Sequence, residues 1–165
     1  MSAPLPRLAL SVHQPWAWAI IFAGKDIENR SFPAIRNMYP ALGSLRALAI
    51  HASAGMTQEE YRDARDFMAA IGVECPPPAY LVRGAVIGEV LVDGVVRSSD
   101  SPWWMGPRGI VLSAPSPCDP KPARGALGLF EWVPSPGVLP EPLKWMVEWG
   151  RPEVGPDDLF GGNPS

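Results

Sequence analysis

The stretch that most limits the fold is GAVIGEVLVDGVV, residues 84–96. Its valine, isoleucine and leucine residues are typical of β-strands, and it is longer than a common strand. Gly88 and Gly94 interrupt it at positions where a β-bulge would bend the strand. The second half of the chain is therefore expected to be rich in β-structure.

Shorter segments complete the predicted sheet. Further strands are expected at 8–12, 26–32, 45–53, 108–114 and 124–133. Pro15 and Gly24 bound a predicted helix, and the capping-box pair Thr57 and Glu60 opens a second one that ends at Gly72. Loops are expected in three places. Prolines indicate the loops at 33–44 and 115–122, and proline, tryptophan and glycine indicate the loop at 97–107. The pattern predicts an α+β fold, a small β-barrel of five to six mainly antiparallel strands with two flanking helices.

The charges divide the chain into two parts. Residues 7–134 carry twelve basic and twelve acidic side chains, whereas residues 135–165 carry two and five. We therefore expect one domain at 1–134, followed by a proline-rich acidic tail at 135–165 that could contact a protein partner. A short helix is expected at 142–149, docked through Leu143, Met146 and Val147, and the end of the chain is expected to be flexible.

Composition also limits the kind of function. A neutral body does not suggest a long basic track for nucleic acid, so it favours a ligand of nucleoside size. Cys75 and Cys118 lie far apart and His13 and His51 are the only histidines, so neither a metal site nor a disulfide framework is expected, and no cofactor is implied. No run of about 20 apolar residues and no signal-peptide pattern is present, which predicts a cytoplasmic protein without membrane contact.

The segment FAGKDIENRSF, residues 22–32, is the first candidate site. It places Lys25, Asp26, Glu28 and Arg30 where a helix passes into a strand. Glu28 and Arg30 share one face of an extended strand and can pair. A lysine in a partly dry pocket can lose its proton near neutral pH and act as a base or nucleophile. The alternative interpretation is a structural ion pair.

Aromatic and polar residues near this segment supply further candidates. Trp103 and Trp104 are adjacent on a loop, where a tryptophan can stack on a base or merely cover the end of the barrel. Gln14 and Trp16 stand at the start of the first helix, and this position favours His13 and Gln14 as polar caps over a role in ligand binding. His51 lies on a strand and is interpreted as a hydrogen-bonded core histidine.

Taken together, these segments resemble the ASCH domain, a branch of the PUA-like superfamily. The resemblance covers about residues 7–133, and Lys25, Glu28 and Arg30 match the signature Gly-x-Lys-x-x-Glu-x-Arg. The glycine position of that signature falls on Ala23, with Gly24 one place later. The resemblance implies a PUA-like β-barrel with a cleft that holds RNA, DNA or a modified nucleobase.

The resemblance does not select one activity. Family members include amidohydrolases that remove acyl groups from the exocyclic amine of cytidine, a ribonuclease, and proteins described only as binding. In the amidohydrolases a lysine works with a threonine three residues later and a distant glutamate. Lys25 fills the first of these places, Glu28 stands at the second, and Asp100 is a candidate for the third.

We therefore expect a domain that binds a nucleobase or nucleic acid, with hydrolysis of N4-acylcytidine by Lys25 and Glu28 as the alternative. A protein-interaction module is the third class that the sequence leaves open. The expected binding residues are Gln14, Trp16, Lys25, Glu28, Arg30, Trp103 and Trp104.

Overall fold

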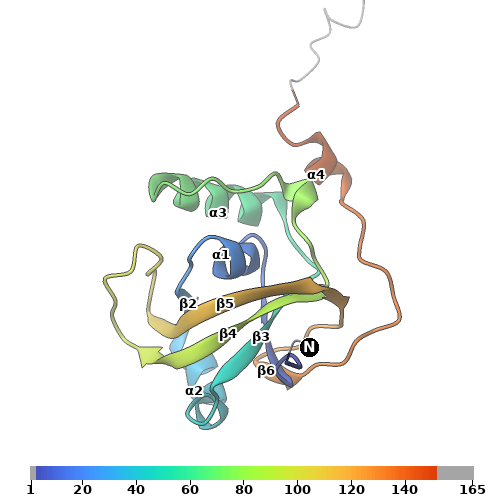
Figure 1. The fold of residues 1–165 in the computed structure, drawn as a ribbon. Coiled ribbons are helices and arrows are strands. Elements are labelled where there is room, and N and C mark those ends of the chain that lie inside the picture. Colours follow the sequence, from blue (N-terminus) through green and yellow to red (C-terminus); the bar gives the residue numbers. More distant parts are fainter. Residues whose placement is uncertain (1–2, 152–165) are drawn as a thin grey trace, which may run out of the picture.

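The computed structural model describes residues 3–151. It has an α+β fold in which a six-stranded, mostly antiparallel sheet curls into a half-barrel (Figure 1). This confirms the fold class expected from the sequence. The strands are β1 (Leu8–Val12), β2 (Ile27–Arg30), β3 (Ala47–Ala52), β4 (Ala85–Val96), β5 (Arg108–Pro122) and β6 (Leu129–Glu131).

Within the described residues, four α-helices and one 3₁₀ turn accompany the sheet. They are α1 (Trp16–Phe22), α2 (Phe32–Leu42), α3 (Gln58–Ala70), η1 (Pro78–Tyr80) and α4 (Lys144–Glu148). The two flanking helices and the short tail helix were expected, whereas α2 and the 3₁₀ turn were not. The predicted capping box of α3 is present, since Thr57 and Glu60 bond each other's backbone amides.

The strands lie side by side in the order β2-β5-β4-β3-β1-β6. β1 and β3 run parallel, and the other neighbouring pairs are antiparallel. The pairing of β4 with β5 shifts register at three places. Two of them are next to Gly88 and Gly94, where the sequence predicted bulges, and the third lies between Glu89 and Leu91. These irregularities bend the two longest strands and help the sheet to curl.

The prediction of a loop at 33–44 is wrong, because most of this segment belongs to α2. Ser31 caps the helix by accepting a hydrogen bond from the Ala34 amide, and Pro33 occupies the first turn, where proline is tolerated. The helix buries Ile35, Met38 and Leu42 in the main core. This burial stabilises α2 despite Pro40, because most helical stability in proteins comes from packing an apolar face.

The prediction of a loop at 115–122 is also wrong, because β5 continues to Pro122. β5 pairs with β2 only over Arg108–Val111, so one side of its remaining length has no strand partner. Proline is tolerated on such an edge, since a missing amide that faces outward breaks no ladder bond. The strand expected at 124–133 is shorter in the structure. Only the three residues of β6 form a strand there, and residues 124–128 form a loop.

Helix α1 lies between the sheet and α3 (Figure 1). Ile20 and Ile21 face the main core with the inner residues of β1, β3, β4 and β5, whereas Ala19 packs towards Met68 of α3 and Trp103. The helix therefore holds the segment that follows it, which includes Lys25, in a fixed position against the sheet.

The first part of the acidic tail packs on the domain. Arg83 donates a hydrogen bond to the Glu141 carbonyl oxygen (2.8 Å), and the expected short helix is present as α4. Met146 is buried, but Leu143 and Val147 are about half exposed, so these two do not form the docking face. Trp145 and Trp149 contact Tyr61 instead. The expectation of a flexible end falls mainly on residues 152–165, outside the described residues.

No helix between residues 3 and 151 combines the length and the apolar character needed to cross a lipid bilayer.

Candidate ligand site at the seam of the half-barrel

The candidate site lies where the curled sheet fails to close. β2 forms one edge of the sheet, and β1 lies next to the other edge. Arg30 of β2 spans the opening, because its Nη2 donates a hydrogen bond to the Ser11 carbonyl oxygen of β1 (3.0 Å). We call this opening the seam. β2 pairs with β5 on one side only, and its charged residues Glu28 and Arg30 meet at this opening.

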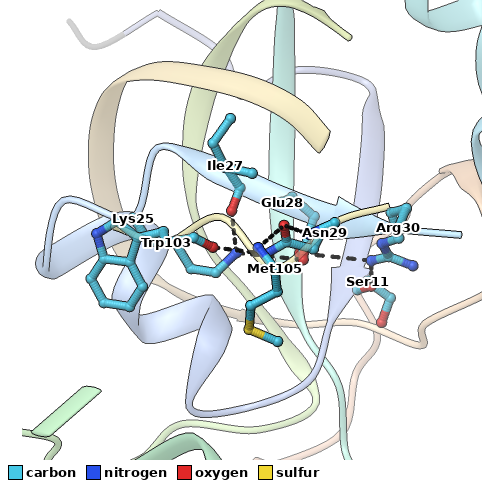
Figure 2. Close-up of polar contacts among 9 residues, drawn as sticks. Ser11, Lys25, Ile27, Glu28, Asn29, Arg30, Trp103 and Met105 are labelled. Atoms are coloured by element: carbon cyan, nitrogen blue, oxygen red, sulfur yellow. Dashed lines mark hydrogen bonds and ion pairs between the residues drawn. The ribbon is translucent and has the colours of Figure 1, made fainter. Parts of the chain in front are cut away.

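Three charged side chains meet in the seam (Figure 2). Lys25 Nζ lies 3.5 Å from Glu28 Oε1, and Arg30 Nη2 lies 3.8 Å from Glu28 Oε2. The side chains of Lys25 and Glu28 are only 2% and 8% exposed, whereas that of Arg30 is 26% exposed. The spacing of the motif thus brings one carboxylate between two cations in a nearly dry position.

Lys25 makes two further contacts besides its ion pair with Glu28. Its ammonium group donates a hydrogen bond to the Ile27 carbonyl oxygen and lies 5.7 Å from the centre of the Trp16 ring. Burial lowers the pKa of Lys25, and the negative charge of Glu28 only partly opposes this effect. A larger fraction of this amine is therefore neutral at a given pH than for an exposed lysine.

Glu28 has an unused acceptor. Its Oε2 atom is buried and makes no hydrogen bond within the described residues, and the Arg30 nitrogen at 3.8 Å is too distant to provide one. Buried polar atoms nearly always have a partner, so an orphaned carboxylate oxygen requires an explanation. A ligand donor is the simplest one, because Glu28 lines a cavity.

That cavity has a volume of about 240 Å³ and opens at the seam. We call it the seam cavity. Its volume is below the roughly 300–1,000 Å³ of pockets for drug-sized ligands, so it suits a single small ring system. It is lined by Val12, His13, Trp16, Lys25, Glu28, Asn29, Arg30 and Met105.

Asn29 joins the seam to the loop at 97–107. Its Nδ2 donates to the Trp103 carbonyl oxygen (2.9 Å), and its Oδ1 accepts from the amides of Met105 (2.9 Å) and Gly106 (3.2 Å). These bonds hold the backbone of Met105 beside β2 (Figure 2), and Met105 is one of the residues that line the seam cavity. Asn29 lies inside the motif segment but was not among the residues expected to form the site.

The structure brings four of the seven expected binding residues together, namely Trp16, Lys25, Glu28 and Arg30. Gln14 does not line the cavity. It is buried, accepts from the Trp18 amide (2.9 Å) and donates to the Val82 carbonyl oxygen (2.6 Å), which matches its alternative interpretation as a polar cap.

The two adjacent tryptophans also lie away from the cavity lining. Trp103 is 4% exposed and packs with Ala19 and Met68, so it covers the core. Trp104 packs over the backbone of Gly106 and Gly109. Met105, the next residue in the loop, reaches the cavity instead.

Two further expectations concern acidic residues and metals. Asp100 is exposed and is absent from the cavity lining, so Glu28 is the carboxylate that this cavity offers. Within residues 3–151, no three histidine, cysteine or acidic side chains gather in an arrangement suited to a metal ion.

Comparison with protein-family models gave no match, and neither did comparison with curated proteins.

Proposed function

We propose that this protein binds a nucleobase in the seam cavity, either as part of a nucleoside or within a nucleic acid. The unpartnered Oε2 atom of Glu28 carries the proposal. A carboxylate oxygen accepts a hydrogen bond from an exocyclic amine, as in the recognition of cytosine. Lys25 and Arg30 compensate the charge of Glu28, so that the carboxylate can be buried beside an uncharged ring.

The walls of the cavity support the same ligand class. Trp16 offers an aromatic surface, and such side chains stack on bases of any sequence. Met105 adds a flexible thioether, which makes favourable contacts with ring edges. The resemblance of the motif to the ASCH signature agrees with this assignment, since Lys25, Glu28 and Arg30 are the residues that match it.

One observation favours a second function, the hydrolysis of N4-acylated cytosine. Burial lowers the pKa of the Lys25 amine, so its neutral form, which can take a proton from water, is more populated than that of an exposed lysine. The water oxygen would then add to the acyl carbon, and the bond from carbon to N4 would break. The proton from Lys25 would go to the leaving amine, giving a carboxylic acid and cytosine.

The binding proposal predicts that one or more nucleosides change the tryptophan fluorescence of the protein and that Glu28→Gln weakens this binding. Loss of a charge-assisted hydrogen bond of roughly 1.5–3 kcal/mol corresponds to about 10- to 150-fold weaker binding. The measurement is a titration with cytidine, adenosine, guanosine and uridine, followed by fluorescence.

Glu131→Gln is the matched control. Glu131 is exposed and pairs with Arg7, outside the seam cavity, so the same chemical change there is expected to leave binding unaltered. Circular dichroism checks that both variants are folded. The proposal is overturned if no nucleoside binds at millimolar concentration, or if both variants bind like the wild type.

The hydrolysis proposal predicts that N4-acetylcytidine loses its characteristic absorbance in the presence of the protein and that Lys25→Met stops the reaction. Lys25→Met retains an unbranched side chain in the buried position but removes the base. Lys144→Met provides the control, since Lys144 is exposed on α4. Absence of turnover at high protein concentration would reject hydrolysis and leave binding as the function.

A further inference from the structure

A second hollow adjoins the seam cavity, and the proposed function does not use it. Its volume is about 540 Å³, and it shares His13 and Arg30 with the seam cavity. We call it the arginine hollow, because Arg30 and Arg124 both line it. The rest of its lining comes from the ends of β1 and β3 and from the loop at 124–128, segments that are far apart in the sequence.

The charge of the arginine hollow is positive. None of its lining residues is acidic. Arg124 is exposed, and within residues 3–151 it forms no ion pair. Two of its lining residues contact carboxylates. Arg30 lies 3.8 Å from Glu28, which lines the seam cavity, and His13 lies 3.9 Å from Glu60. A hollow lined by two arginines and by no carboxylate is suited to a phosphate, which arginine binds with paired N–H donors.

The floor of the arginine hollow is polar but uncharged. His51 Nε2 lies 2.8 Å from the Ala123 carbonyl oxygen, which can only accept, so Nε2 carries the proton. Burial lowers the pKa of His51, and the neutral ring then accepts at Nδ1 from the Ser11 hydroxyl (2.9 Å). Ser11 Oγ in turn accepts from Ser53 (2.9 Å). The floor therefore brings no negative charge to the hollow.

Gly125 shows that the loop is fitted closely to this floor. A Cβ atom at position 125 would lie 2.8 Å from His51 Cε1 and 3.0 Å from Ser11 Oγ. Both neighbours are fixed by the hydrogen bonds just described, so a side chain there would push the loop away. The glycine thus lets the loop carry Arg124 close to the end of β1.

We propose that the arginine hollow holds a phosphate group, so that the ligand is a nucleotide rather than a free nucleobase; this rests on the proposed binding of the base in the seam cavity. Arg30 stands between the two spaces, contacting Glu28 on one side and lining the hollow on the other. The phosphate can belong to a mononucleotide or to a nucleic-acid strand. A third hollow of about 520 Å³, which shares Arg30, Leu127 and Gly128, would accommodate the next unit of a strand.

The test compares each nucleoside with its own phosphates. The protein is titrated with three sets of ligands, and its tryptophan fluorescence is measured. The sets are the four ribonucleosides, their 5′- and 3′-monophosphates and the matching tetranucleotides. We expect one monophosphate to bind at least about tenfold more tightly than its nucleoside, because it adds charge-assisted hydrogen bonds. Arg124→Gln is expected to abolish most of this gain and to leave the affinity for the nucleoside unchanged.

Arg46→Gln is the control, because Arg46 is exposed and immediately precedes β3, at the end of that strand remote from Ala52. Tighter binding of the tetranucleotide than of the monophosphate would assign the phosphate to a strand, and equal binding would assign it to a mononucleotide. If nucleoside and monophosphate bind equally, the phosphate site is refuted while binding of the base stands. If neither binds, the proposed function itself fails and the inference with it.

Discussion

Gly88→Ala is expected to destabilise this protein by about 1–3 kcal/mol, and by more if the sheet cannot adjust. The added Cβ would lie 2.5 Å from the Ser116 carbonyl oxygen of β5 and 2.8 Å from Ile21 Cδ1 of α1. The first neighbour is backbone and cannot rotate away. For a chain of this length, 2 kcal/mol corresponds to a fall in Tm of roughly 4–8 °C.

The cause is steric, since Gly88 does not need a left-handed conformation. Gly55→Ala is the matched control, because Gly55 is exposed and a Cβ there meets no atom within 4 Å. Thermal unfolding followed by circular dichroism measures both variants. Equal Tm values for the two would show that α1 does not pack on the β4–β5 pair as closely as described.

The sequence predicted some secondary-structure elements correctly and others wrongly, and the difference has a physical reason. Regular patterns within one segment, such as the long apolar run of β4 and the capping box of α3, identified their elements correctly. The errors at α2 and β5 have a common origin. Proline was counted as a breaker from its local chemistry, but its cost depends on whether the missing amide faces a partner and on what the segment buries. Neither fact is visible in the segment itself.

In the candidate site, too, the residues that lie close in sequence were predicted, whereas those brought together by tertiary contacts were not. Lys25, Glu28 and Arg30 were identified because short spacing on one turn and one strand fixes their relative positions. Trp103 was expected at the site, but the loop that carries it is fixed by Asn29, which turns Met105 to the cavity instead. The arginine hollow could not be foreseen, because its walls are joined only by the sheet topology.

The buried ion pair gives the second large effect. Glu28→Leu is expected to destabilise the protein by about 3–5 kcal/mol at neutral pH, because it leaves the buried Lys25 ammonium group without its anionic partner. The double variant, with Lys25→Met added, is expected to recover most of this loss. Buried ion pairs are often replaced by apolar residues of similar volume at little cost, whereas removal of one partner is costly.

The pH dependence of this loss distinguishes an electrostatic cause from a packing defect. Glu28 is the largest factor that raises the pKa of Lys25, so its removal lowers that pKa further below the ordinary value of 10.5. Between the lowered pKa and 10.5, the folded protein binds fewer protons at Lys25 than the unfolded chain. Stability therefore rises with pH in this window. The wild type shows the same rise only above its own, higher Lys25 pKa, so the deficit of Glu28→Leu shrinks with rising pH between the Lys25 pKa of the variant and that of the wild type.

Urea unfolding of the wild type, both single variants and the double variant at several pH values completes the cycle. Burial raises the pKa of Tyr61, Cys75 and Cys118, which makes stability fall at high pH, but these groups are common to all four proteins and cancel in the differences. The double variant lacks both titrating groups, so its difference from Glu28→Leu isolates Lys25. A deficit that stays constant with pH, or a double variant no more stable than Glu28→Leu, would mean that the cost comes from lost packing and not from an unpaired charge.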